Sequence, residues 1–156
     1  FSDYYCFACG FFYYSECGCT YRIDGNNDPA GSRIMGLRLY YDFKEPERGD
    51  IVIFKYPDDE SVDYLKRIIG LPGETVEIIS VRSILMVNCW MSLSGEEPTG
   101  DFGPYQVPED SYFMLGDNRA VSKDSRYWHN TYVKKDKIIA KAFVMYWSVI
   151  EVGWVN

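Results

Sequence analysis

The sequence has little positive charge, one histidine and no long apolar run. Its 16 Lys and Arg residues are outnumbered by 23 Asp and Glu residues, which gives a net charge of −7. This balance argues against nucleic-acid binding, which depends on a basic surface. No apolar stretch is long enough to cross a bilayer as a helix. We interpret His129, the one histidine, as a surface residue rather than a catalytic base.

The first twenty residues lack the basic start of a signal peptide, and the chain begins with Phe1 rather than Met. We therefore interpret the chain as a fragment or a processed product. The stretch holds four of the five cysteines, which suggests a zinc site as one alternative. The second cysteine pair is too closely spaced for an ordinary zinc knuckle, so we expect no metal and no cofactor. The five cysteines are Cys6, Cys9, Cys17, Cys19 and Cys89.

The pattern of apolar residues predicts a mainly β, all-β fold. Aromatic residues make up 17% of the chain, and such residues favour strands. Short apolar runs alternate with Pro, Gly and Asp turn signals, for example the loop expected at 57–61. Outside the N-terminus no helical periodicity extends beyond about two turns, and at the N-terminus we expect a short coiled or helical segment. The predicted strands lie in residues 33–40, 51–54, 64–70, 75–79, 112–115 and 138–155.

Two features suggest chemistry when they are taken together. Lys66 lies inside an apolar run, where strand alternation places either Lys66 or Arg67 on the buried side. Residues 116–128 pack hydroxyl, carboxylate and guanidinium groups directly after another apolar strand. Either feature alone is also compatible with an ordinary solvated surface.

Four blocks of the sequence resemble the signature regions of the type I signal peptidases, in the same order, within residues 31–147. The resemblance implies a signal-peptidase-like β fold, related to the C-terminal domain of the self-cleaving SOS repressors, which lack the Gly-Asp-Asn-Arg block. It also implies a serine endopeptidase with a Ser-Lys dyad. The blocks are Gly49-Asp50-Ile51-Val52, Tyr64-Leu65-Lys66-Arg67-Ile68-Ile69-Gly70-Leu71-Pro72-Gly73-Glu74, Gly100-Asp101-Phe102-Gly103-Pro104-Tyr105, and Gly116-Asp117-Asn118-Arg119 with Ser122-Lys123-Asp124-Ser125-Arg126-Tyr127-Trp128.

The resemblance assigns roles to individual residues. Lys66 is the general base, and a lysine can act as one near neutral pH only if an apolar setting lowers its pKa. Ser122 is expected to hydrogen-bond the Lys66 amine. Asp124 and Arg126 are expected to form an ion pair that braces the loop, and Asp117 to hold its turn. Asn118 and Arg119 complete the supporting set.

The nucleophile expected from the resemblance is missing. The family carries it in a Gly-Ser-Met-Glu block, and the matching position here is Ile23. The nearest serines are Ser15 and Ser32, and Ser32 lies at a strand entrance where the family commonly has Ser or Asp rather than its nucleophile. We therefore expect the chain to be inactive or nearly so. The alternative is a catalytically dead homologue that binds extended peptides by strand addition.

The genetic code offers an explanation for the missing serine. Read one nucleotide downstream, the codons for residues 19–29 permit Val-Pro-Thr-Gly-Ser-Met-Glu-Thr-Thr-Ile, with the serine at position 23. In the other shifted frame, residues 85–93 permit Asn-Gly-Glu-Leu-Leu-Asp-Glu-Ser, which has the turn of a hairpin. We hypothesise that residues 1–29 and 80–94 are translated from the gene in a shifted reading frame.

The organisation expected from the resemblance has two parts. Residues 1–30 form an aberrant segment in place of a membrane anchor and the nucleophile block, and residues 31–156 form the β catalytic domain. The expected partners are signal peptides of secreted preproteins and the membrane lipid surface, with no nucleic acid. The implied location is the cell membrane, with one span and the catalytic domain on the extracytoplasmic side.

Overall fold

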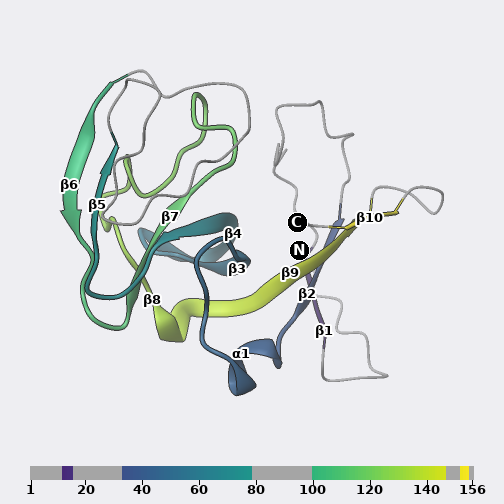
Figure 1. Cartoon of the computed structure of the whole chain (residues 1–156). Helices are drawn as coiled ribbons and strands as arrows, with labels where there is room; N and C mark the ends of the chain where they lie inside the picture. Colours follow the sequence, from purple (N-terminus) through teal and green to yellow (C-terminus); the bar gives the residue numbers. More distant parts are fainter. Residues whose placement is uncertain (1–11, 16–32, 79–99, 147–151, 155–156) are drawn as a thin grey trace.

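A computed structural model describes residues 12–15, 33–78, 100–146 and 152–154 of the chain (Figure 1). Ile23, the five cysteines and, apart from residues 12–15, both stretches of the frame-shift hypothesis lie outside the described residues. The described strands are β1 (Phe12–Ser15), β2 (Arg33–Leu37), β3 (Ile51–Tyr56), β4 (Asp59–Gly70), β5 (Thr75–Ile78), β6 (Phe102–Gln106), β7 (Ser111–Leu115), β8 (Val133–Lys134), β9 (Ile138–Tyr146) and β10 (Val152–Trp154).

The strands form one large antiparallel sheet and one small one. The large sheet has the order β1-β2-β9-β3-β4-β7-β8, and β10 also pairs with β9. The small sheet consists of β5 and β6. Every strand pair in the described ranges is antiparallel. The helical elements among the described residues are one α-helical turn, α1 (Tyr40–Phe43), and a 3-10 turn, η1 (Lys135–Lys137).

This architecture confirms the predicted mainly β fold and corrects three local expectations. The strand predicted for residues 33–40 is shorter, since β2 ends at Leu37 and Tyr40 begins α1. Residues 12–15, expected to be coil or helix, form strand β1 because they pair with β2. The loop expected at 57–61 is shorter than predicted, since strand β4 already begins at Asp59. The connection between β3 and β4 is therefore a tight hairpin turn, with Tyr56 paired to Asp59 across it.

Strand β3 lies at the centre of the large sheet, between β9 and β4. Its first four residues, 51–54, are all buried, as expected for an apolar run covered on both faces. Side chains from one face of β3 join a core with Trp128, and Phe54 there is fully buried. Side chains from its other face join a second core with β9. The two cores fix β4, which carries Lys66, against the middle of the sheet.

Replacing Phe54 by Ala should lower the free energy of unfolding by about 3–5 kcal/mol, because it opens a cavity in the central core. The matched control is Phe43→Ala, since Phe43 is 83% exposed on α1. The control should change stability by less than about 0.5 kcal/mol. Denaturant unfolding of both variants measures the difference, and equal losses would contradict the core assignment.

Candidate active site

Lys66 and the polar loop at residues 116–128 are brought together by strand pairing. Strand β4 pairs with β7 so that Arg67 lies opposite Leu115, and the loop starts at the next residue, Gly116. A side-chain Cβ placed on Gly116 would lie 3.3 Å from Lys66 Nζ and 2.5 Å from Ser122 Cβ, and it would overlap Ser122 Oγ. The two side chains therefore converge on Gly116, where only a residue without a side chain fits.

Ser122 faces Lys66 but does not form the expected hydrogen bond. Its hydroxyl oxygen is buried and has no hydrogen-bond partner in the part of the chain that the structure describes. The hydroxyl is packed over Gly116, and the Ser122 backbone amide donates to the carbonyl of Asn118 at 3.1 Å. The hydrogen bond expected between Ser122 and Lys66 is thus absent from this structure, although the two residues share one site.

Asp117 connects the start of the loop to β4. Both of its carboxylate oxygens accept from Arg67, Nε to Oδ1 and Nη2 to Oδ2, each at 2.8 Å. The third Arg67 nitrogen, Nη1, donates to the carbonyl of Gly49 at 2.8 Å. Asp117 thus holds the loop against the strand beside Lys66, rather than only holding a local turn as expected. Sequence reasoning did not include Arg67 in the site, although alternation with Lys66 gave a signal for it.

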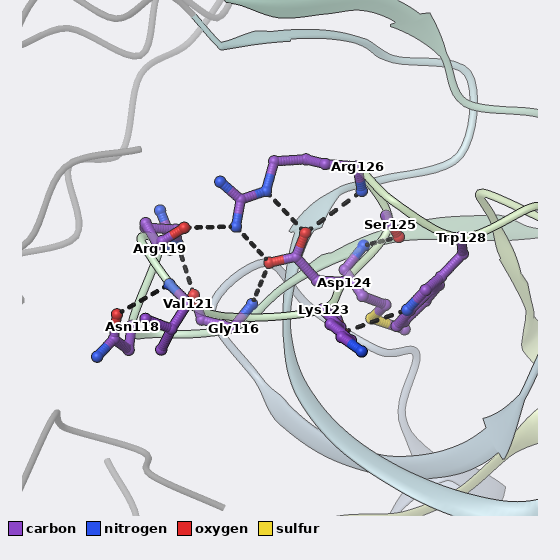
Figure 2. A network of polar contacts seen from close by, with 10 residues as sticks. Gly116, Asn118, Arg119, Val121, Lys123, Asp124, Ser125, Arg126 and Trp128 are labelled. Atoms are coloured by element: carbon purple, nitrogen blue, oxygen red, sulfur yellow. Dashed lines mark hydrogen bonds and ion pairs between the residues drawn. The ribbon is translucent and has the colours of Figure 1, made fainter. Parts of the chain in front are cut away.

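Asp124 and Arg126 form the expected ion pair, and both side chains are fully buried. Arg126 Nε donates to Asp124 Oδ1 at 2.7 Å and Nη2 donates to Oδ2 at 2.9 Å (Figure 2). Asp124 Oδ2 also accepts the Gly116 amide at 3.0 Å, and Arg126 Nη2 donates to the carbonyl of Arg119 at 2.7 Å. One carboxylate therefore connects the beginning, middle and end of the loop.

Asn118 and Arg119 shape the turn that leads to Ser122. Arg119 is 5% exposed, and its Nε donates to the carbonyl of Gly116 at 2.8 Å (Figure 2). Burial lowers the pKa of Arg119, against the opposing effect of Asp117 and Asp124. Asn118 Oδ1 accepts the Val121 amide at 3.4 Å. Both residues act on the backbone of the loop rather than on Lys66.

Ser125 is a further residue of this loop that sequence reasoning left out of the site. Its hydroxyl accepts the amide of Met114 at 3.0 Å, and its own amide donates to the Met114 carbonyl at 3.1 Å. These two hydrogen bonds attach the loop to β7. His129 is exposed, in agreement with its interpretation as a surface residue. Within the described ranges, no group of His, Cys, Asp and Glu side chains could hold a metal ion.

The signal peptidase family, peptidase S26, matches residues 21–147. The chain belongs to this family. It is 37% identical over 129 residues to a probable signal peptidase I-2 of Synechocystis. The matched region covers 78% of this chain and 57% of that protein. It is 35% identical over 133 residues to a signal peptidase I of Leptolyngbya laminosa, covering 80% of the chain and 64% of that relative. The chain thus spans about three fifths of the length of these relatives.

The solved structures agree with the sequence comparison. A crystal structure of a signal peptidase I from Enterococcus faecalis V583 is similar at 34% identity with a TM-score of 0.50. The alignment covers 63% of this chain and 97% of that one. This match confirms the signal-peptidase-like β fold, and the family to which the chain belongs is one of serine endopeptidases. The predicted family is therefore confirmed.

Replacing Asp124 by Asn should lower the free energy of unfolding by about 3–5 kcal/mol, because it leaves the Arg126 charge buried without a counter-charge. The control Asp42→Asn changes a carboxylate that is exposed on α1, and it should shift stability by less than about 0.5 kcal/mol. Urea unfolding monitored by fluorescence compares the two. A loss for Asp124→Asn no larger than that of the control would show that the pair does not brace the loop.

Replacing Gly116 by Ala should destabilise the chain by about 1–3 kcal/mol, because the new methyl group overlaps Ser122. In a Ser122→Gly background the same change should be much less costly, since the overlapping atoms are gone. A double-mutant cycle of unfolding free energies measures this coupling. Additive effects would contradict the close packing of Ser122 over Gly116.

Proposed function

We propose that this chain comes from a type I signal peptidase that removes N-terminal signal peptides from exported preproteins at the membrane surface. The observation that carries the proposal is the convergence of Lys66 and Ser122 on Gly116, in a chain that belongs to the signal peptidase family. A lysine base must be held in one orientation by rigid surroundings. The strand that carries Lys66 and the braced loop beside it supply such surroundings.

The proposed chemistry is acyl transfer through a serine. The unprotonated Lys66 amine takes the proton of the serine hydroxyl, and the oxygen attacks the carbonyl carbon of the scissile peptide bond. The resulting tetrahedral intermediate collapses to an acyl-enzyme while the protonated amine returns its proton to the leaving amine. Water, deprotonated by the same lysine, then hydrolyses the ester and regenerates the serine. Ser122 packs beside this base at Gly116, and the ion pair of Asp124 and Arg126 braces the loop that carries Ser122.

The printed sequence lacks the serine that this chemistry requires. Ile23 occupies the matching position, and an isoleucine side chain has no proton to give and no nucleophilic atom. We therefore propose that this chain is inactive as it stands and that its gene encodes serine in a shifted frame. The supporting observation is that one shifted frame permits the complete Gly-Ser-Met-Glu block in register with the family.

The division of the chain and its location are further parts of the proposal. Residues 1–30 would stand in place of the anchor and the nucleophile block, and residues 31–156 would form the catalytic domain. No helix among the described residues is both long and apolar enough to span a bilayer. Membrane anchorage by one span, with the domain on the extracytoplasmic side, is supported by family membership.

A second candidate function is peptide binding without cleavage. The observation that favours it is Ile23 at the nucleophile position of a chain that otherwise retains Lys66 and its supporting loop. Such a homologue would bind extended peptides by adding a strand to the sheet. The two candidates differ in whether a restored serine brings back turnover.

Cleavage of a signal-peptide substrate should be absent from this chain and should appear when residues 19–28 are replaced by the ten-residue block Val-Pro-Thr-Gly-Ser-Met-Glu-Thr-Thr-Ile. Ile23→Ser alone tests whether the hydroxyl suffices. In the restored chain, Lys66→Ala should lower kcat roughly 10²–10⁴-fold because the general base is gone. Mass spectrometry of the products measures the cleavage and its position.

The control is Lys55→Ala, which removes a lysine that pairs with Asp63 on the same hairpin, and it should retain the activity of the restored chain. Cleavage by the unaltered chain would show that its nucleophile is not missing. Full activity of the Lys66→Ala variant would show that another group is the base. A restored chain that binds the peptide and never cleaves it would favour the binding homologue.

A further inference from the structure

The tip of the β3–β4 hairpin holds the chain segment that follows the polar loop. Asp58 lies in the hairpin turn, where its Oδ2 accepts the amide of His129 at 2.9 Å and its Oδ1 accepts the amide of Asn130 at 2.7 Å. The Tyr56 hydroxyl also donates to Oδ2 at 3.0 Å. A carboxylate that accepts two successive backbone amides fixes both the position and the direction of that segment.

Trp128, the residue before this segment, is packed on the same hairpin. Its ring centroid lies 5.5 Å from that of Tyr56 and 6.0 Å from that of Tyr64, and these two tyrosines stack on each other at 4.3 Å. Trp128 is 7% exposed, so its position is set by packing. Its indole Nε1 donates to the carbonyl of Lys123 at 3.2 Å (Figure 2).

These contacts form a continuous path from Asp58 to the site. Asp58 fixes the amides of residues 129 and 130, Trp128 adjoins them, and the indole holds the carbonyl of Lys123. Lys123 directly follows Ser122 in the chain, and the side chain of Ser122 lies over Gly116 beside Lys66. The hairpin that carries Lys66 thus holds the loop at its end through Asp58, and at its start through the pair of Arg67 and Asp117.

We propose that Asp58 is a positioning residue: its grip on residues 129 and 130 holds the end of the 116–128 loop and thereby keeps Ser122 in place beside Lys66. Its kinetic consequence rests on the proposed peptidase function, whereas its structural consequence does not. Burial acts to raise the pKa of Asp58, but hydrogen bonds from Asn130, His129 and Tyr56 lower it on balance. Asp58 is therefore a carboxylate at neutral pH, the form that accepts both amides.

Amide hydrogen exchange tests the structural consequence, and it needs no restored nucleophile block. The amides of Ser122 and Tyr127 donate within the loop, to the carbonyls of Asn118 and Asp124. In Asp58→Ala we expect these two amides to exchange about tenfold faster or more, because the loop opens locally more often. The reference for global opening is the amide of Val107, which donates to the backbone carbonyl of Glu74 at 2.8 Å next to the small sheet.

The matched control is Asp59→Ala. Asp59 is the neighbouring carboxylate at the first residue of β4. Among the described residues it accepts from Ser61 alone, at 3.1 Å from the amide and 2.6 Å from the hydroxyl. This variant should leave the exchange of Ser122 and Tyr127 unchanged. Asp58→Asn, which keeps the size and one acceptor oxygen, should give an intermediate rate and serves if the alanine variant does not fold. Faster exchange confined to His129 and Asn130 would overturn the proposal.

The kinetic consequence is measured in the chain with the restored nucleophile block. Asp58→Ala should lower kcat about tenfold or more with KM changed less than about twofold, because a misplaced base slows the chemical step more than binding. Asp58→Glu, which retains a carboxylate, should recover part of kcat. An unchanged kcat in a variant with a lowered Tm would overturn the proposal, since a merely structural role gives that result. If the restored parent itself does not cleave, the proposed function fails and the exchange experiment still decides the role of Asp58.

Discussion

The conformation of the loop beside Lys66 depends on one buried carboxylate. Asp124 accepts the Gly116 amide at the start of the loop and the Arg126 guanidinium at its end, and neither side chain of the pair is exposed. A buried ion pair adds little net stability, because desolvation of the charges offsets their attraction. Removing one partner, however, leaves the other charge without compensation. The intact pair therefore matters chiefly because its carboxylate and guanidinium also hold backbone groups of the loop.

That conformation has a consequence for Gly116. Because its amide is held by Asp124 and its carbonyl by Arg119, its orientation is fixed, and its missing side chain leaves room for Lys66 and Ser122. The site thus depends on the close approach of Lys66 and Ser122 to the backbone of Gly116, whose amide and carbonyl are both hydrogen-bonded. A lysine base is useful only when its surroundings keep it in one place, and the described residues provide such surroundings on β4 and on the loop.

Local patterns in the sequence predicted much of this arrangement. The apolar run at 51–54 gave the central buried strand, and the polar run after residue 115 gave the loop. The ion pair of Asp124 and Arg126 was implied by the resemblance to the signal peptidases rather than by the local pattern. Contacts between distant residues were not predictable in this way. Arg67 pairs with Asp117 across 50 residues, and Asp58 binds His129 across 71, so neither partner is visible in a local pattern. Strand β1 was missed for the same reason, since its pairing with β2 decides its structure.

The chain has the fold of a signal peptidase. We propose that it also retains the lysine base of that family and that a shift of reading frame removes the serine from the printed sequence. Resequencing the coding DNA for residues 1–35 and 78–97 tests this claim most directly. We expect the corrected frames to encode the Gly-Ser-Met-Glu block and the Asn-Gly-Glu-Leu-Leu-Asp hairpin. If the DNA confirms the printed reading in both stretches, the gene encodes this fold without its nucleophile, and the account is contradicted.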